Sequence, residues 1–144
     1  MGDSNVDSRD FEPEIERSRI EAQSVTDGDL VLTPANLKKY RNVTGDAAAP
    51  LRYAYYLLGD AEGKAVMDYG RGSGENSVIL STLGAKVTGI DISPELIDLS
   101  KRRMEIAGLH WKARVGSAYA TGEPDGSFDV VFGAAILHHL DIED

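Results

Sequence analysis

The chain has 144 residues, of which 42% are hydrophobic, with 15 basic and 24 acidic residues, a net charge of −9 and no cysteine. This length and apolar content suit one domain with a single core. The acidity argues against nucleic acid as a partner, because neutralising phosphates requires clustered Lys and Arg. The lack of cysteine excludes disulfides and thiolate metal sites, and we predict no metal site.

The first residues are polar and strongly acidic. Residues 1–30 hold nine acids and three bases. We expect residues 1–12 to form a disordered acidic lead, because they carry too few apolar groups to offset the entropy of ordering. No apolar run reaches transmembrane length and no basic-then-apolar leader begins the chain, so we expect no membrane partner and a cytoplasmic location.

Residues 13–60 are predicted to form an N-terminal helical segment. The signals are proline at helix starts, Ser or Thr at caps and glycine at stops. The expected elements are a helix over 13–23, a turn at 27–29, a helix that begins at Pro34 after the cap Thr33, and a helix over 50–58 that stops at Gly59.

From residue 61 to residue 144 strands and helices alternate, which predicts an α/β fold with a parallel sheet. In the helix that Ser93 caps, we expect Met104 and Ala107 to face inward and Arg103 to face largely outward. The expected elements are strands over 65–67, 86–90, 111–115 and 128–132, with helices over 75–83 and from Pro94 to Gly108.

Three glycines follow the first of these strands. Gly70, Gly72 and Gly74 lie between a strand and a helix, where they allow a backbone to approach a ligand closely. Asp91 ends the next strand, about twenty residues later, where a carboxylate grips a ribose in nucleotide-binding folds. The pattern predicts a ligand site rather than a plain turn.

The kind of ligand follows from the neighbouring charges. The dinucleotide fingerprint requires a third glycine three residues after Gly72, and Glu75 occupies that position. Asp68 adds a second carboxylate on the same edge. These acids disfavour a pyrophosphate and favour a ligand with an ammonium group and a positive sulfur.

Four motifs occur in order over roughly residues 50–144. Together they resemble the successive motifs of class I S-adenosylmethionine-dependent methyltransferases of the small-molecule type. The resemblance implies a Rossmann-like parallel sheet with helices on both faces, here with four strands in the order 3-2-1-4. The motifs are Asp68-x-Gly70-x-Gly72-x-Gly74, Gly89-Ile90-Asp91-Ile92-Ser93, Gly126-Ser127-Phe128-Asp129-Val130-Val131 and Leu137-His138-His139-Leu140.

The resemblance also implies roles for individual residues. The turn from Gly70 to Gly74 would wrap the methionine part of S-adenosylmethionine, and Asp68 would support its amino group. Asp91 would accept from both ribose hydroxyls, as a carboxylate can. Ile92 would lie against the adenine face, with an ordinary core position as the alternative.

Further positions around the same site depart from the family or are less specific. Ser117 stands where the family often has an aspartate that accepts from the adenine amino group, so this contact is weaker or comes from a backbone carbonyl. Ala118 and Gly133 are predicted to contact the cofactor. Arg71 replaces a small residue or cysteine, and its side chain points to solvent, reaches a substrate carboxylate or crowds the turn.

Catalysis has a single candidate side chain. His138 follows the fourth strand and could accept a proton as the methyl is transferred, or could pack or shape the pocket. Displacement from a sulfonium needs mainly alignment, so proximity alone can suffice. Tyr40 and Arg41 could cover the cofactor, although a surface or core role fits them better.

The resemblance predicts an S-adenosylmethionine-dependent methyltransferase that converts the cofactor to S-adenosylhomocysteine and methylates a small molecule. The alternatives are a cofactor-binding module without activity and a nicotinamide-dependent oxidoreductase. The family's sheet has seven strands and only four are found here. We therefore expect a fragment of a longer protein, or a homo-oligomer formed through the exposed edge of the fourth strand.

Overall fold

The structure is a computed structural model that describes residues 11–41, 49–70 and 72–140. Most of the predicted disordered lead and all of Arg71 lie outside the described residues. The elements are helices α1 (Glu12–Ser24), α2 (Asp27–Leu30), α3 (Pro34–Arg41), α4 (Ala49–Leu58), α5 (Glu75–Thr82) and α6 (Pro94–Ile106), the 3-10 helix η2 (Leu137–His139), and strands β1 (Ala65–Tyr69), β2 (Lys86–Asp91), β3 (Ala113–Val115) and β4 (Val130–Gly133).

The four strands form one parallel sheet in the order β3-β2-β1-β4. Val66 in the centre of β1 is in register with Val87 of β2 and Val130 of β4. This confirms the predicted α/β class and strand order. Because the strands are parallel, their carboxyl ends meet at one edge of the sheet, and the loops that follow them converge there.

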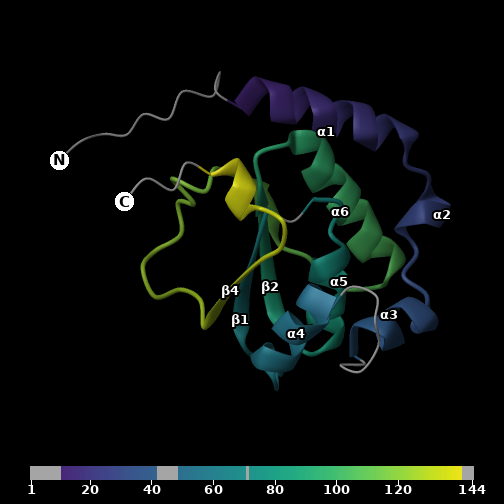
Figure 1. Cartoon of the computed structure of the whole chain (residues 1–144), viewed down its shortest axis with the longest axis vertical. Coiled ribbons are helices and arrows are strands. Elements are labelled where there is room, and N and C mark those ends of the chain that lie inside the picture. The colour runs from purple at the N-terminus through teal and green to yellow at the C-terminus, as the bar shows by residue number, and fades with distance from the viewer. Residues whose placement is uncertain (1–10, 42–48, 71, 141–144) are drawn as a thin grey trace.

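The main core lies between the sheet and helices α4 and α5. Val66, Ile79 and Leu80 are at most 2% exposed. Tyr55 of α4 stacks on Phe132 of β4 with ring centroids 5.1 Å apart, which joins the helix to the last strand. Figure 1 shows α4, α5 and α6 on one side of the sheet and the connection between β3 and β4 on the other.

The helix starts are where the sequence places them. Helix α6 begins at Pro94, and the Ser93 hydroxyl accepts a hydrogen bond from the Leu96 N–H. Helix α3 begins at Pro34, and the Thr33 hydroxyl accepts from the Asn36 N–H at 3.2 Å. Both caps satisfy N–H groups that a helix cannot pair internally.

Three local expectations are wrong. The segment predicted as a turn at 27–29 is the short helix α2, in which Thr26 and Asp29 form a capping box. Arg103 is only 7% exposed, because the N-terminal segment covers the side of α6 that was expected to face solvent. Ala107 is exposed and is the C-cap residue that follows the end of α6 at Ile106.

The N-terminal helices wrap around α6 and the upper end of the sheet (Figure 1). Helix α1 lies across that end and has no buried residue. Helix α2 in contrast buries Leu30. In the part of the chain that the structure describes, no helix combines the length and apolarity needed to cross a bilayer.

Candidate functional site

A cavity of about 170 Å³ opens at the carboxyl ends of the strands, beneath α1. Its walls come from the turn after β1, the end of β2, the turns after β3 and β4, and α1. Six of the predicted cofactor residues line it: Gly70, Gly72, Asp91, Ile92, Ser117 and Ala118. Residues far apart in the sequence therefore meet at one site, as the parallel topology requires.

The turn after β1 strongly favours glycine at its first position. Gly70 has a φ of 61°, and its N–H donates to the Ile90 carbonyl at 3.0 Å. A β-carbon there would lie 2.6 Å from Cδ1 of Ile136. Gly72 has a φ of 52° with no atom within 4 Å of where its β-carbon would be, so its backbone faces open space. A ligand can approach this backbone closely.

Asp91 organises the floor of the cavity. One carboxylate oxygen accepts from the Gly72 N–H at 2.9 Å, and the other accepts from the Ser93 N–H at 3.0 Å. The residue is 8% exposed and lines the cavity. These contacts orient the carboxylate and fix the glycine turn relative to α6, so the acid is held in place before any ligand arrives.

Three predicted cofactor residues are not among those that line the cavity. Asp68 is fully buried and accepts a hydrogen bond from the Ser77 hydroxyl of α5. Gly74 is the N-cap residue of α5. Gly133 ends β4, with its would-be β-carbon 3.1 Å from the Ile136 side chain. All three residues therefore shape the turns around the cavity and do not form the cavity surface.

The other side of the cavity is formed by the turn after β3. The Gly116 N–H donates to the Asp91 carbonyl at 2.9 Å, which continues the pairing of β2 with β3. The Ser117 hydroxyl accepts from the Tyr119 N–H at 3.3 Å. Ser117 therefore shapes this turn, next to Ala118 and opposite Ile92.

The sequence did not point to several residues that line the cavity. Tyr69, at the end of β1, is one of them, and burial raises its pKa to about 12, with Tyr119 and Asp91 adding to the effect. Ile136 is another, whereas His139 belongs to the pair of histidines that the sequence places after the fourth strand. Strand alternation was a possible signal for Tyr69, because it places this side chain on the other face of the sheet from the buried Asp68.

Four residues of α1 also line the cavity, which the sequence did not indicate. Each belongs to a helix with no buried residue, whose half-buried face has only Ile15 and Ala22 as apolar side chains, so the apolar stripe that would mark a contact face is weak. The four are Glu14, Arg17, Ser18 and Glu21, and Phe11 joins them just before the helix.

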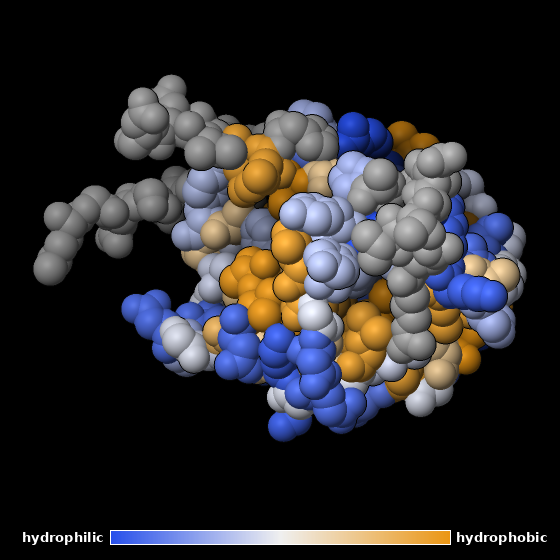
Figure 2. All heavy atoms as spheres, turned by 60° about the horizontal axis from the view of Figure 1, so that its bottom comes forward, coloured by the Kyte–Doolittle hydropathy of each residue, from blue (hydrophilic) through white to orange (hydrophobic). Residues whose placement is uncertain are grey.

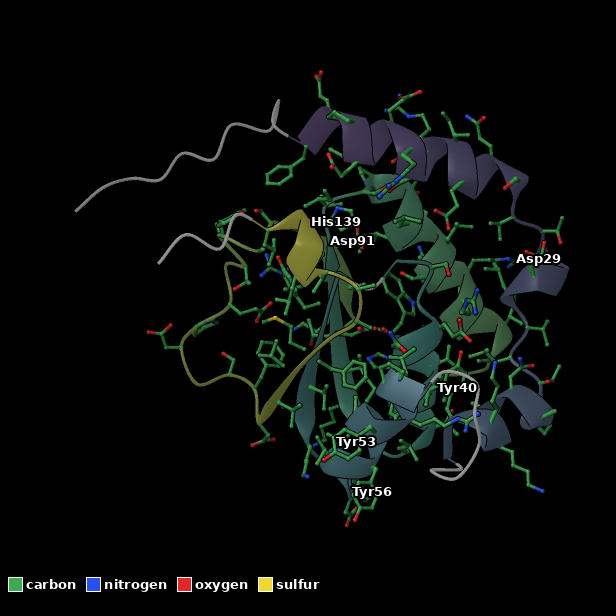
Figure 3. The ribbon with its side chains drawn as sticks, in the orientation of Figure 1. Asp29, Tyr40, Tyr53, Tyr56, Asp91 and His139 are labelled. Carbon is green, nitrogen blue, oxygen red and sulfur yellow. The ribbon has the colours of Figure 1, made fainter. Side chains whose placement is uncertain are left out.

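The predicted catalytic and covering residues are placed as follows. His138 lies in η2, with its side chain outside the described part of the structure, while the neighbouring His139 lines the cavity. Asp91 and His139 both lie at the upper end of the sheet, beneath α1 (Figure 3). Tyr40 donates to the Glu75 carboxylate at 2.8 Å on the helical side of the sheet. The side chain of Arg41 is outside the described part.

The site fits the group that the sequence motifs imply. A sulfonium nucleoside needs an acid for its ribose, an apolar slot for its base and exposed backbone for its amino acid end. Asp91 offers the first, Ile92 and Ala118 line an apolar section, and Gly72 presents open backbone. In the wall above, Glu14 and Glu21 outnumber Arg17, which further favours a positively charged ligand.

Residues 66–144 match the family described as methyltransferase domain. A demethylmenaquinone methyltransferase from Tropheryma whipplei is 35% identical over 90 residues, which are 62% of this chain and 36% of that protein. A ubiquinone biosynthesis O-methyltransferase from Methylocella silvestris is 34% identical over 79 residues, 55% of this chain and 31% of that protein. The chain thus spans well under half the length of these relatives.

The fold agrees with solved structures. A SAM-dependent methyltransferase from Aquifex aeolicus superposes with a TM-score of 0.57 at 24% identity, covering 76% of this chain and 61% of that one. At this identity the likeness shows the fold. Since the family match extends over residues 66–144 of 144, the chain belongs to the methyltransferase domain family, the class I S-adenosylmethionine-dependent methyltransferases.

Proposed function

We propose that the cavity binds S-adenosylmethionine and that the whole protein transfers its methyl group to a small-molecule acceptor. The observation that carries this proposal is the carboxylate of Asp91, held at the mouth of the glycine turn by the Gly72 and Ser93 N–H groups. The names of the relatives, which are quinone-pathway methyltransferases, support a small-molecule acceptor.

Each wall of the cavity has a proposed part in binding. Asp91 accepts from the ribose hydroxyls, and the turn from Gly70 to Gly74 surrounds the methionine end. Ile92 and Ala118 enclose the adenine, with Ser117 beside them. Asp68 acts from behind by fixing the turn through Ser77.

The cofactor supplies an activated methyl group on a positive sulfur. The protein then has to align the acceptor with the methyl group and to exclude water. Alignment alone can provide most of the rate acceleration. A hydroxyl acceptor also has to lose a proton, and we propose the histidine pair His138 and His139 for this role. The position of His139 in the cavity wall supports the proposal.

Calorimetry with S-adenosylmethionine, S-adenosylhomocysteine and NAD tests the proposal. We expect both sulfur ligands to bind and NAD to give no heat, because Glu75 stands where a dinucleotide site needs glycine. Tight NAD binding without a response to the sulfur ligands would overturn it in favour of an oxidoreductase. Binding without turnover on any acceptor would favour a cofactor-binding module.

We further propose that the protein is cytoplasmic, has no nucleic-acid partner and associates through the edge of β4. The net charge of −9 supports the second point. The third is supported by Val131, which is 65% exposed in the last strand of the described sheet. Figure 2, which views the molecule from the lower end of Figure 1, shows hydrophobic atoms at the surface among polar ones.

A further inference from the structure

The N-terminal segment is attached firmly at one place, where α2 and α3 meet the domain. Leu30 is 2% exposed, so α2 contributes to the core. The buried Arg103 guanidinium donates to the Asp29 carbonyl at 3.4 Å and to the Ser73 hydroxyl of the glycine turn at 3.3 Å. Tyr40 of α3 donates to Glu75 at the start of α5. These contacts are partly or fully buried.

Helix α1 is attached in a different way. It has no buried residue, and Ile20 is 62% exposed. An extended pair of residues, Val25 and Thr26, separates it from α2. Beyond the half-buried Ile15 and Ala22 and the stacking of Phe11 on Tyr119 just before it, helix α1 has little apolar surface to hold it in place. It nevertheless forms the wall of the cavity that faces Asp91.

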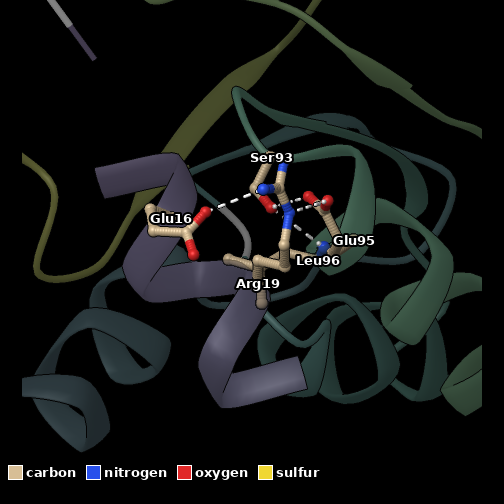
Figure 4. Close-up of polar contacts among 5 residues, drawn as sticks. All are labelled: Glu16, Arg19, Ser93, Glu95 and Leu96. Atoms are coloured by element: carbon tan, nitrogen blue, oxygen red, sulfur yellow. Dashed lines mark hydrogen bonds and ion pairs between the residues drawn. The ribbon is translucent and has the colours of Figure 1, made fainter. Parts of the chain in front are cut away.

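Among the described residues, one ion pair joins α1 to the domain, and Arg19 forms it. The Arg19 Nε donates to Glu95 at 3.1 Å, and its Nη1 contacts Glu16 of the same helix at 2.7 Å (Figure 4). Glu95 lies in the first turn of α6 and accepts from the Ser93 hydroxyl at 3.1 Å. The N–H of Ser93 in turn donates to Asp91.

This chain of contacts links the position of α1 to the cofactor site. Arg19 and Glu95 are 76 positions apart in the sequence, so their contact exists only when α1 lies across the cavity. The two residues directly before Arg19, Arg17 and Ser18, line the cavity wall. The contact between Arg19 and Glu95 therefore positions the cavity wall that α1 forms.

We propose that Arg19 is a positioning residue for the cofactor site. By pairing with Glu95 it seats α1 as a hinged cover of the cavity, and the cover swings about Val25 and Thr26 to admit and release the cofactor. This inference rests on the proposed function, because it assigns the cavity to S-adenosylmethionine.

Arg19→Ala tests the inference, with Arg102→Ala as the matched control. Arg102 also forms an inter-element ion pair, with Asp27 at 2.7 Å, and its side chain is 53% exposed against 49% for Arg19. That pair joins α2 to α6 outside the cavity wall. Exposed ion pairs of this kind shift an equilibrium by about two- to fivefold.

Two measurements are made on the 144-residue chain. Without ligand, hydrogen exchange of the α1 amides should be about two- to fivefold faster in Arg19→Ala and unchanged in Arg102→Ala. With S-adenosylhomocysteine, stopped-flow dissociation should be faster by a similar factor in Arg19→Ala alone. Arg19→Lys keeps the charge and should restore both rates most of the way.

The results separate this inference from the proposed function. Equal α1 exchange in wild type and Arg19→Ala would overturn the positioning role, whatever the ligand does. Faster exchange with an unchanged dissociation rate would overturn it too, because α1 would then not cover the ligand. If no sulfur ligand binds to the wild-type chain, the proposed function fails and the covering role with it, while the exchange rates still decide whether Arg19 seats α1.

Discussion

A β-carbon at Gly70 would strain the left-handed backbone and would also clash with the Ile136 side chain. We expect Gly70→Ala to lower the free energy of unfolding by about 2 to 4 kcal/mol, from the left-handed backbone and from the contact with Ile136. Gly108→Ala is the matched control, because Gly108 has a φ of 66° with nothing within 4 Å. Its cost should be about 1 to 2 kcal/mol. Urea denaturation measures both, and equal costs would contradict the role of Ile136.

Asp91 combines a structural and a binding role, and two substitutions separate them. Asp91→Ala should weaken S-adenosylhomocysteine binding by about 10- to 100-fold, the value of a hydrogen bond to a charged group. Asp91→Asn keeps one acceptor oxygen and should lose less. Calorimetry gives the affinities, and circular dichroism checks that losing the Gly72 and Ser93 contacts has not unfolded the protein. Unchanged affinity in a folded Asp91→Ala protein would refute the ribose assignment.

At the scale of elements, the N-cap residue of α6, Ser93, contributes both to the stability of the helix and to the position of Asp91 in the cavity. Ser93 is fully buried, and its hydroxyl accepts from the Leu96 N–H at 3.2 Å. Ser93→Ala should cost about 1 kcal/mol, because it leaves a helix N–H without a partner, whereas Ser93→Gly should cost a few tenths, since glycine is a tolerated cap. Thermal unfolding compares the two. A larger loss for glycine than for alanine would show that packing, not capping, determines the cost.

Local signals predicted most of these elements. Ser93 with Pro94, and Thr33 with Pro34, set helix starts through contacts within four residues, so the sequence alone identifies them. The strands and their parallel direction follow from alternation, whereas their order came from the resemblance to the methyltransferase family. The glycines and Asp91 belong to the site because strand ends in a parallel sheet converge, a property of topology rather than of particular side chains.

The remaining part of the site depends on contacts between distant segments. Arg103 was expected at the surface because Lys101, Arg102 and Arg103 form a basic run, but the N-terminal segment, 74 positions away, covers it. The wall that α1 contributes depends on Arg19 meeting Glu95. Neither helix periodicity nor composition contains that information, since both residues are ordinary solvated charges within their own helices.

For the whole molecule, buried phenols make stability sensitive to alkaline pH. Burial raises the pKa of Tyr40 to about 12, with its bond to Glu75 adding to the effect, and burial raises the pKa of Tyr55 further. A raised folded pKa favours the protonated state. The stabilisation is therefore complete below the ordinary value of 10.0 and is lost as pH rises from there through the folded pKa.

We expect the free energy of unfolding, measured by urea denaturation, to fall between pH 10 and pH 12, by up to about 1.4 kcal/mol per pH unit for a fully buried tyrosine. Tyr55→Phe is less stable at pH 8, because the bond to Asn76 at 2.7 Å is lost, but its alkaline decline should be shallower than that of the wild type. Absorbance of tyrosinate at 295 nm follows the titration. Parallel declines in the two proteins would rule out Tyr55 as a contributor.

The described sheet ends at two edge strands, β4 and β3. We expect substitutions on these two strands to affect association differently. In the described sheet β4 has β1 on one side only, and Val131 in its centre is 65% exposed. Unpaired strand edges with apolar side chains associate, and a lysine on the edge prevents this. Val131→Lys should therefore shift size-exclusion chromatography with light scattering from an associated species toward the monomer.

Val115→Lys provides the matched change on the opposite edge, since Val115 of β3 is 50% exposed and that strand pairs only with β2 in the described sheet. It adds the same charge and removes the same side chain, so it controls for the general effect of charge on solubility. Association through β4 predicts that Val115→Lys leaves the mass distribution of the wild type unchanged. A stable monomer in the wild type, or equal shifts in both variants, would exclude the β4 edge as the specific contact.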